Sequence, residues 1–155
     1  MSVSARLAEL GIELPSVVPP VAAYIPAKLH GDLVYTAGQL PMVSGALPET
    51  GKVGEGEGLV TPDAAAGYAR QCALNAVAAA AAAAGGVDRL AGVLKVTGFV
   101  ASVPEFTGQP GVINGASTVL GEIFGEAGRH ARSAVGVPVL PLDAPVEVEV
   151  VFTLA

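Results

Sequence analysis

Near its C-terminus the chain alternates between apolar and charged side chains, and this pattern constrains the fold more than any other. Val146, Val148 and Val150 occupy every second position, with Glu147 and Glu149 between them. Successive side chains of a strand point to opposite faces, so this period predicts a strand that buries its valines and turns its glutamates the other way. Such a strand belongs to a sheet that is covered on one face.

A long alanine-rich helix is predicted to supply part of that cover. It runs from Thr61 through Ala84, because Thr61 can cap it, Pro62 fits its first turn and Gly85-Gly86 stops it. Alanine has the highest helix propensity, and its small side chain lets a helix lie close against a sheet. We therefore interpret this segment as structural.

A second long helix and the shorter elements complete the expected fold. The second helix begins at Pro110 and ends at Gly125, with an apolar stripe at helical spacing. The other expected elements are a helix at 2–10, an extended connection to residue 20, a hairpin of strands at 22–28 and 33–39, a long mobile loop at 41–60, and strands at 92–101, 131–138 and 145–154. We expect the last two strands to pair across a tight turn. These elements predict one α+β domain, residues 1–155, with a mixed sheet and both long helices packed on one face.

The composition favours a protein that assembles with copies of itself. Charged residues make up only 14% of the chain and hydrophobic residues 52%, so one chain alone would expose apolar surface. The net charge is −6, and the eight basic residues are scattered along the sequence. Because nucleic-acid binding normally requires clustered basic residues, this balance argues against an RNA or DNA partner.

The cysteine, the histidines and the glycine-rich loop do not indicate a redox, metal or nucleotide site. Cys72 is the only cysteine and lies among alanines, where a buried apolar role is expected. His30 and His130 lack metal-ligand spacing, and His130 is expected at a surface or interface. The glycines at 54–58 lack the Gly-Lys-Ser/Thr ending of a phosphate-binding loop. Without a signal peptide or an apolar run long enough to span a bilayer, the chain is expected in the cytoplasm.

Arg132 and Glu147 are the residues whose chemistry suggests a hydrolytic site. Arginine keeps its charge at physiological pH and grips a carboxylate through two parallel hydrogen bonds. Glu147 is expected on the strand next to that of Arg132, close enough to activate a water molecule. The residues alone leave a structural alternative open, in which Arg132 forms a salt bridge with Glu147 or Glu149. Glu149 itself is expected to be structural or solvated.

Several segments together resemble one protein family. They are ARSAV at 131–135 with LP at 140–141 and VEVE at 146–149, then LVYTAGQLP at 33–41, and KVTGFV at 95–100. With a weaker match around Asn114, they make the chain similar to the RidA (YjgF) family of reactive-intermediate imine deaminases, over about residues 24–152. The length of the chain resembles a subgroup formerly labelled endoribonuclease L-PSP.

The resemblance implies a chorismate-mutase-like fold that assembles as a homotrimer, with sheets lining a central barrel and ligand clefts between subunits. It implies hydrolytic deamination of 2-imino or enamine acids to 2-oxo acids and ammonia, without a metal or an organic cofactor. The implied partners are a small 2-imino or 2-oxo acid and further copies of the chain, with no nucleic acid and no membrane. The alternatives are a regulatory trimer that binds small carboxylates without turnover and, against the acidic balance, an endoribonuclease.

The same match assigns roles to individual residues. Arg132 corresponds to the arginine that binds the substrate carboxylate, and Glu147 to the glutamate that orients or activates water. The residues matched to other ligand contacts are Tyr24, the backbones of Gly38 and Ala134, and, more weakly, Asn114.

The chain also departs from the family pattern. Ala37 stands where many members carry serine, which removes one hydroxyl contact. Ala134 stands where many carry cysteine, so only its backbone remains available. The N-terminal helix and the loop at 42–60 are additions relative to the shorter members, and deaminase activity does not follow automatically for this longer subgroup.

Overall fold

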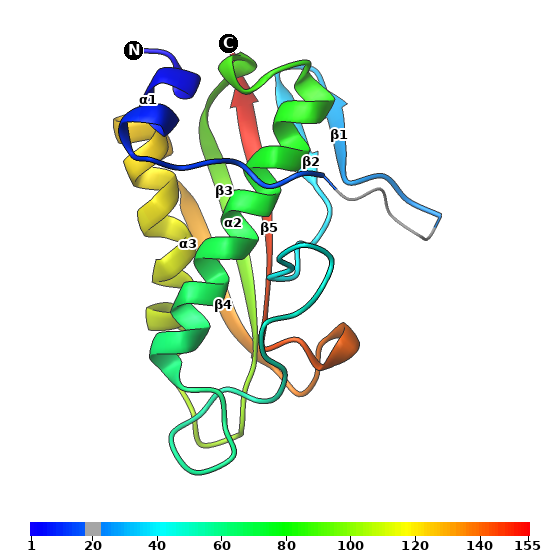
Figure 1. The fold of residues 1–155 in the computed structure, drawn as a ribbon, viewed down its shortest axis with the longest axis vertical. Coiled ribbons are helices and arrows are strands. Elements are labelled where there is room, and N and C mark those ends of the chain that lie inside the picture. The colour runs from blue at the N-terminus through cyan, green and yellow to red at the C-terminus, as the bar shows by residue number, and fades with distance from the viewer. Residues whose placement is uncertain (18–22) are drawn as a thin grey trace.

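A five-stranded sheet carries two long helices on one face in the computed structural model, which describes residues 1–17 and 23–155 (Figure 1). The helices and strands are α1 (Val3–Glu9), β1 (Ala27–His30), β2 (Leu33–Thr36), α2 (Pro62–Ala84), β3 (Leu90–Ala101), α3 (Gln109–Phe124), β4 (Ala131–Val137) and β5 (Val146–Leu154). Three single-turn helices join them, namely η1 (Val87–Arg89), η2 (Gly125–Gly128) and η3 (Pro141–Asp143). The predicted α+β fold with a mixed sheet and two long helices is therefore confirmed.

The strand order corrects one expectation, because β4 and β5 are not neighbours. The order is β1-β2-β5-β3-β4, so β3 lies between the last two strands. The helix α3 carries the chain from β3 to the outer edge of the sheet, where β4 pairs with β3 in parallel. The return segment through η3 then brings β5 back to the other side of β3, antiparallel to it. A crossover helix makes the parallel pairing possible, and no tight turn could do so.

The helix-facing side of the sheet forms the core, as the alternation in β5 predicts. Val146, Val148, Val150 and Phe152 are all buried under the helices. Cys72 is fully buried among the alanines of α2, and burial raises the pKa of its thiol, in keeping with the expected apolar role. The helices α2 and α3 pack closely against each other because glycine leaves room between their backbones. A Cβ at Gly115 would collide with the Ala66 carbonyl oxygen.

The caps of α2 agree with the prediction in detail. The Thr61 hydroxyl accepts a hydrogen bond from the Ala64 N–H at 3.2 Å. Gly85 ends the helix in the left-handed region at φ 84°, which a residue without a Cβ adopts at little cost. The helix α3 begins one residue before the predicted Pro110 and ends at Gly125.

Other element boundaries shift by a few residues. The strand expected at 22–28 appears as Ala27–His30, while Ala22, Pro19 and Pro20 lie outside the described residues. The strand expected at 33–39 pairs regularly only to Thr36, followed by a single bridge between Gln39 and Val148.

The glycine-rich loop is anchored, which differs from the expected mobile loop. Val53 and Val60 are buried in the core and bridge to each other. The Tyr68 hydroxyl donates to the Glu49 carboxylate at 2.6 Å, and this bond raises the pKa of Tyr68 to about 12. Apolar residues inside a glycine-rich segment hold it against the body of the protein, since burying them is favourable.

Within the described ranges, no helix combines the length and the apolar character that crossing a membrane would require.

Candidate functional site

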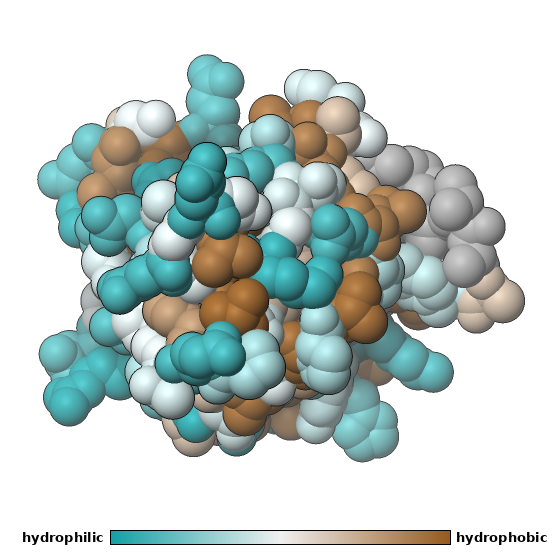
Figure 2. Space-filling view, turned by 90° about the horizontal axis from the view of Figure 1, so that it is seen from below, coloured by the Kyte–Doolittle hydropathy of each residue, from teal (hydrophilic) through white to brown (hydrophobic). Residues whose placement is uncertain are grey.

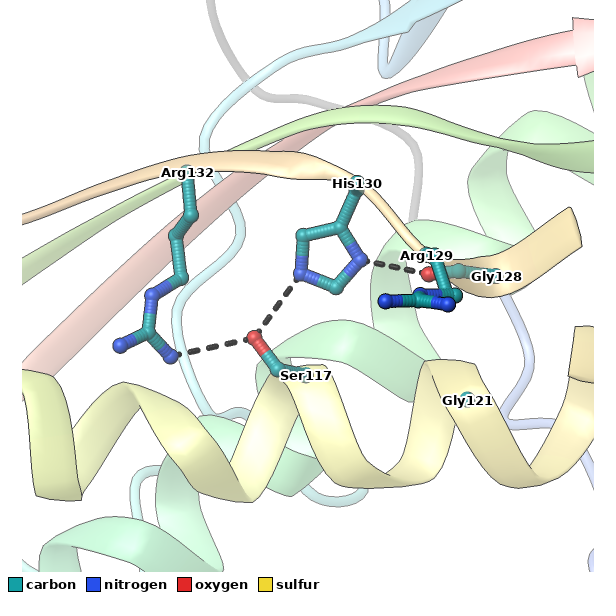
Figure 3. A pocket seen from close by; sticks show the side chains of 6 residues that line it. All are labelled: Ser117, Gly121, Gly128, Arg129, His130 and Arg132. Carbon is teal, nitrogen blue, oxygen red and sulfur yellow. Dashed lines mark hydrogen bonds between the residues drawn. The ribbon is translucent and has the colours of Figure 1, made fainter. Parts of the chain in front are cut away.

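Arg132 extends from the edge strand β4 toward the helix α3 (Figure 3). It pairs in register with Val96, which is buried beneath the helices, so both side chains point to the helix side. Its guanidinium donates to the Asn114 Oδ1 at 2.8 Å and to the Ser117 Oγ at 3.2 Å. A third bond runs to the Pro110 carbonyl oxygen at 3.3 Å. The side chain is thus fixed by three groups from a single helix.

All three partners of Arg132 are uncharged, so its positive charge is not neutralised within the described part of the chain. The ion pairs found there involve other residues, which excludes a closed salt bridge from Arg132 to Glu147 or Glu149 in this chain. Arg132 also lines a hollow of about 370 Å³ that opens to solvent. Its lining residues are Ser117, Gly121, Gly128, Arg129, His130 and Arg132. Because its hydrogen-bond partners are uncharged and the hollow is open, the Arg132 guanidinium can bind an anion.

Glu147 lies on the opposite face of the sheet. It pairs in register with Phe99, three positions along β3 from the partner of Arg132, and an odd step reverses the face. The side chain is half-buried, and this burial, with a smaller contribution from Glu149, raises the pKa of the Glu147 carboxyl. A raised pKa makes a carboxylate a stronger base than one in open solvent.

Gly38 lies directly against Glu147. A Cβ at position 38 would overlap the Glu147 Oε1 atom. The sequence suggested that Gly38 lets a ligand approach the backbone, and the structure adds a second requirement, which is space for the Glu147 carboxylate. Gly38 and Glu147 therefore form one half of the candidate site.

Arg132 and Glu147 do not meet within one chain, which corrects the expectation that they lie on adjacent strands. Two strand spacings and three residues of rise place their Cα atoms roughly 14 Å apart. Their side chains also leave the sheet on opposite faces. The pattern of each strand was correctly interpreted, but the position of β3 between them is set by the crossover through α3.

Of the remaining predicted site residues, Asn114 and Ala134 lie on the same side of the sheet as Arg132. Asn114 contacts Arg132 directly. Ala134 lies two residues further along β4, half-buried and on the same face as Arg132. Tyr24 precedes β1, and 57% of its surface is exposed.

Ser117 and His130 belong to the same cluster, although the sequence interpretation left both out. The Ser117 Oγ and the His130 Nε2 lie 2.9 Å apart, and the His130 Nδ1 lies 2.6 Å from the Gly128 carbonyl oxygen. Spacing could have indicated both residues. Ser117 is three residues after Asn114 on α3, and His130 is two residues before Arg132.

No metal centre accompanies this cluster. Across residues 1–17 and 23–155, no three His, Cys, Asp or Glu side chains approach closely enough to hold a metal ion. The groups that contact Arg132 are an amide oxygen, a hydroxyl oxygen and a carbonyl oxygen, and none of them carries a charge, so the guanidinium remains suited to an anionic organic ligand.

Comparison with known proteins relates this chain to others of the same fold. Residues 4–154 match the family model described as "YjgF/chorismate mutase-like, putative endoribonuclease". Protein TCP17 of Trypanosoma cruzi is 43% identical over 155 residues, which cover 98% of this chain and 94% of that protein. The crystal structure of Atu1372 from Agrobacterium tumefaciens, a protein of unknown function, is 42% identical, with a TM-score of 0.87 over 99% of this chain and 92% of that one.

Two further structures extend the comparison. A Shewanella oneidensis protein that is also described as a putative endoribonuclease is 32% identical. Its TM-score is 0.91, over 99% of this chain and 100% of that one. Escherichia coli TdcF, solved with bound serine, is 23% identical with a TM-score of 0.64, over 90% of this chain and 94% of that one, and shows a shared fold. The chain therefore belongs to the YjgF/chorismate mutase-like family.

Proposed function

We propose that this protein hydrolyses small 2-imino or enamine acids to 2-oxo acids and ammonia. The observation that carries the proposal is the Arg132 guanidinium, which neutral partners hold at an open hollow without an opposing carboxylate from its own described residues. The resemblance of the segment around Arg132 to the RidA family supports the same ligand class, and residues 4–154 match the YjgF/chorismate mutase-like family model.

The chemistry requires little machinery, because a protonated imine carbon is already electrophilic. Arg132 binds the substrate carboxylate through two hydrogen bonds and so fixes the position of the neighbouring carbon. A water molecule forms the new C–O bond and gives one proton to Glu147. Glu147 then passes that proton to the nitrogen of the resulting carbinolamine. The C–N bond breaks as the hydroxyl oxygen forms the C=O bond, ammonia leaves, and the hydroxyl proton passes to water. The raised pKa of Glu147 favours the proton transfer to Glu147 at neutral pH.

We propose further that the site is completed between the subunits of a homotrimer. Since Arg132 and Glu147 lie apart in one chain, Arg132 would act together with Glu147 of the partner subunit. The open face of the sheet supports association, because Tyr35 and Val135 leave 46% and 44% of their surfaces exposed there. Apolar side chains also reach the surface at the end of the molecule shown in Figure 2. Apolar side chains left exposed on a sheet face can be covered by a further copy of the chain.

The test supplies 2-aminoacrylate from a dehydratase and measures the release of ammonia and 2-oxo acid. Wild-type protein is expected to accelerate both, and Arg132→Ala is expected to abolish the acceleration. A solution mass close to that of one chain would contradict the shared site. Equal rates with and without the protein would contradict the deaminase assignment.

A second candidate is a regulatory trimer that binds small carboxylates without turnover. The serine bound to TdcF, a ligand with a carboxylate, favours it. Binding of 2-oxobutanoate that requires Arg132, with no acceleration of imine hydrolysis, would support this candidate.

An endoribonuclease is the third candidate, and the charge distribution argues against it. The net charge is −6, and the basic residues are spread along the chain. If RNA cleavage persists in Arg132→Ala and co-purifies with a contaminant, the endoribonuclease candidate is excluded.

A further inference from the structure

Ser117 and His130 form a hydrogen-bonded pair beside Arg132 that the proposed reaction does not use (Figure 3). We propose that this pair makes the hollow a proton-linked binding site for small 2-oxo acids, in which His130 takes up a proton when the carboxylate binds to Arg132. This inference concerns the regulation of the proposed site, and it rests on the proposed binding of a carboxylate by Arg132.

The directions of the hydrogen bonds follow from what each group can donate. The Gly128 carbonyl oxygen can only accept, so the His130 Nδ1 carries a hydrogen toward it at 2.6 Å. Arg132 can only donate, so the Ser117 Oγ accepts from it at 3.2 Å. With a neutral ring, the single Ser117 hydrogen therefore points to the His130 Nε2 at 2.9 Å. The tautomer of the neutral ring is thereby defined.

Protonation of the ring reverses one of these bonds. The His130 Nε2 then becomes a donor, and the Ser117 Oγ accepts from both His130 and Arg132. The Ser117 hydrogen must turn away from the ring and becomes available to a ligand in the hollow. An anion bound to Arg132 would then lie near both cations and would favour the protonated ring.

Within one chain, the described charged groups around His130 do not supply that anion. Arg129 also lines the hollow, and its partner Glu126 on η2 is 91% exposed at 3.4 Å from it. On α3, Glu122 borders a separate hollow together with Arg6. Lys95 of β3 reaches Ser133 at 3.4 Å on the other face of the sheet. No carboxylate is among the residues that line the hollow in the described structure.

A small 2-oxo acid matches this arrangement. Its carboxylate would take the N–H groups of Arg132 that Asn114, Ser117 and Pro110 leave unused. Its C2 oxygen would accept the hydrogen that Ser117 releases when His130 is protonated. The volume of about 370 Å³ accommodates a small organic acid. By thermodynamic linkage, the ligand favours protonation of His130 as much as protonation favours the ligand.

The first experiment uses the wild-type protein and 2-oxobutanoate. Isothermal titration calorimetry in buffers of different ionisation enthalpy measures the protons taken up on binding. We expect net uptake near neutral pH and binding about fivefold tighter at about pH 6 than at about pH 8, at the lower end of typical couplings because the hollow is open. Binding with no proton uptake and with constant affinity would overturn the proposal without any variant.

Three variants identify the group that takes up the proton. His130→Gln is expected to remove the uptake and the pH dependence, whereas His30→Gln, on exposed β1, is expected to keep both. Glu147→Gln tests whether the carboxylate takes up the proton instead. Uptake that disappears in Glu147→Gln and persists in His130→Gln would assign the proton to the carboxylate and contradict the role of His130.

Ser117→Ala tests, independently of His130, whether the Ser117 hydroxyl donates a hydrogen bond to the C2 oxygen of the ligand. Butanoate lacks that oxygen, so the ratio of the 2-oxobutanoate and butanoate affinities measures its contribution. We expect this ratio to fall about three- to tenfold in Ser117→Ala, the range for loss of one hydrogen bond. An unchanged ratio would contradict the contact between Ser117 and the ligand.

The outcomes separate this inference from the proposed function. If 2-oxobutanoate binding depends on Arg132 but takes up no proton, the inference fails and the ligand class stands. If binding takes up a proton through His130 while no imine is hydrolysed, the inference stands and the deaminase assignment fails. If wild-type protein does not bind 2-oxobutanoate at any pH, the linkage is overturned.

Discussion

Arg132 and Glu147 present opposite charges in contrasting environments. Neutral oxygens from α3 hold Arg132 in place on an edge strand. Glu147 lies in the middle of the sheet, half-buried, where burial and Glu149 both oppose its charge. In one region, hydrogen bonds hold the charged guanidinium of Arg132 in place. In the other, burial and the charge of Glu149 raise the pKa of the Glu147 carboxyl.

The contrast shows why the two residues are not paired in one chain. An ion pair between them would neutralise the guanidinium and lower the pKa of the carboxyl. It would remove both the carboxylate-binding cation and the strengthened base. Separation by β3 keeps both properties available for a ligand.

The largest expected effect comes from Arg132→Lys, which keeps the charge and removes the planar two-point grip. We expect kcat/KM for imine hydrolysis to fall about 100-fold, since lysine cannot replace the paired hydrogen bonds. The matched control is Arg129→Lys, because Arg129 lines the same hollow but its side chain is 81% exposed. Near-normal turnover in Arg132→Lys would show that charge alone is sufficient.

Gly38→Ala tests the other region. The added Cβ would displace the Glu147 carboxylate, so we expect about a tenfold loss of kcat. The obstructing atoms are the end of a flexible side chain, and we therefore expect stability to change by less than about 1 kcal/mol. The comparison of steady-state kinetics with urea unfolding separates the two effects.

Gly67→Ala is the control for that variant. Gly67 lies at an exposed position of α2, and a Cβ there meets nothing within 4 Å. It is expected to keep full activity and to gain up to about 1 kcal/mol of stability from helix propensity. A similar loss of activity in both variants would contradict a specific role for Gly38.

Asn114→Ala removes one of the groups that hold Arg132. We expect a two- to tenfold loss in kcat/KM, on the order of one hydrogen bond, because Ser117 and the Pro110 carbonyl still position the guanidinium. Thr118→Ala, at an exposed position one turn later on α3, is the control and should leave the rate unchanged. A loss in Asn114→Ala as large as that in Arg132→Lys would indicate direct contact with the substrate.

The smallest expected effect is on the pH dependence of stability. Burial raises the pKa of Glu147 above its ordinary value of 4.5, so the folded state binds this proton more readily than the unfolded chain. The contribution of Glu147 to stability is therefore present below 4.5 and is lost as the pH rises through the folded pKa. We expect Glu147→Gln to be more stable than wild type at neutral pH, by less than about 1 kcal/mol.

Urea unfolding at a series of pH values measures this difference. The advantage of Glu147→Gln should shrink as the pH falls toward 4.5. Glu149→Gln should lower the pKa of Glu147 and give a smaller change, because Glu149 is the lesser cause of the shift. Parallel curves for wild type and Glu147→Gln would contradict the effect of burial.

Local patterns predicted the elements closely where their physical cause is local. The cap at Thr61, the stop at Gly85 and the alternation in β5 all act over a few residues, and the structure contains each of them. The glycine-rich loop was less predictable, because its anchoring depends on Val53 and Val60 reaching a core that distant segments build.

The candidate site was predicted in part for the same reason. Arg132 and Asn114 were both identified, and the structure brings them into contact. Ser117 and His130 were missed, because each becomes notable only when α3 and β4 place them side by side. An isolated serine within a helix and a lone histidine carry no local signal of their partnership.

By itself, the sequence determined which segments form helices and strands, which faces they bury and which family the chain resembles. The tertiary structure alone decided that β3 lies between Arg132 and Glu147, and that a serine and a histidine join the arginine at one hollow. The reason is physical. Periodicity and capping depend on neighbours along the chain, whereas strand order and side-chain clusters depend on the path that the chain takes between them.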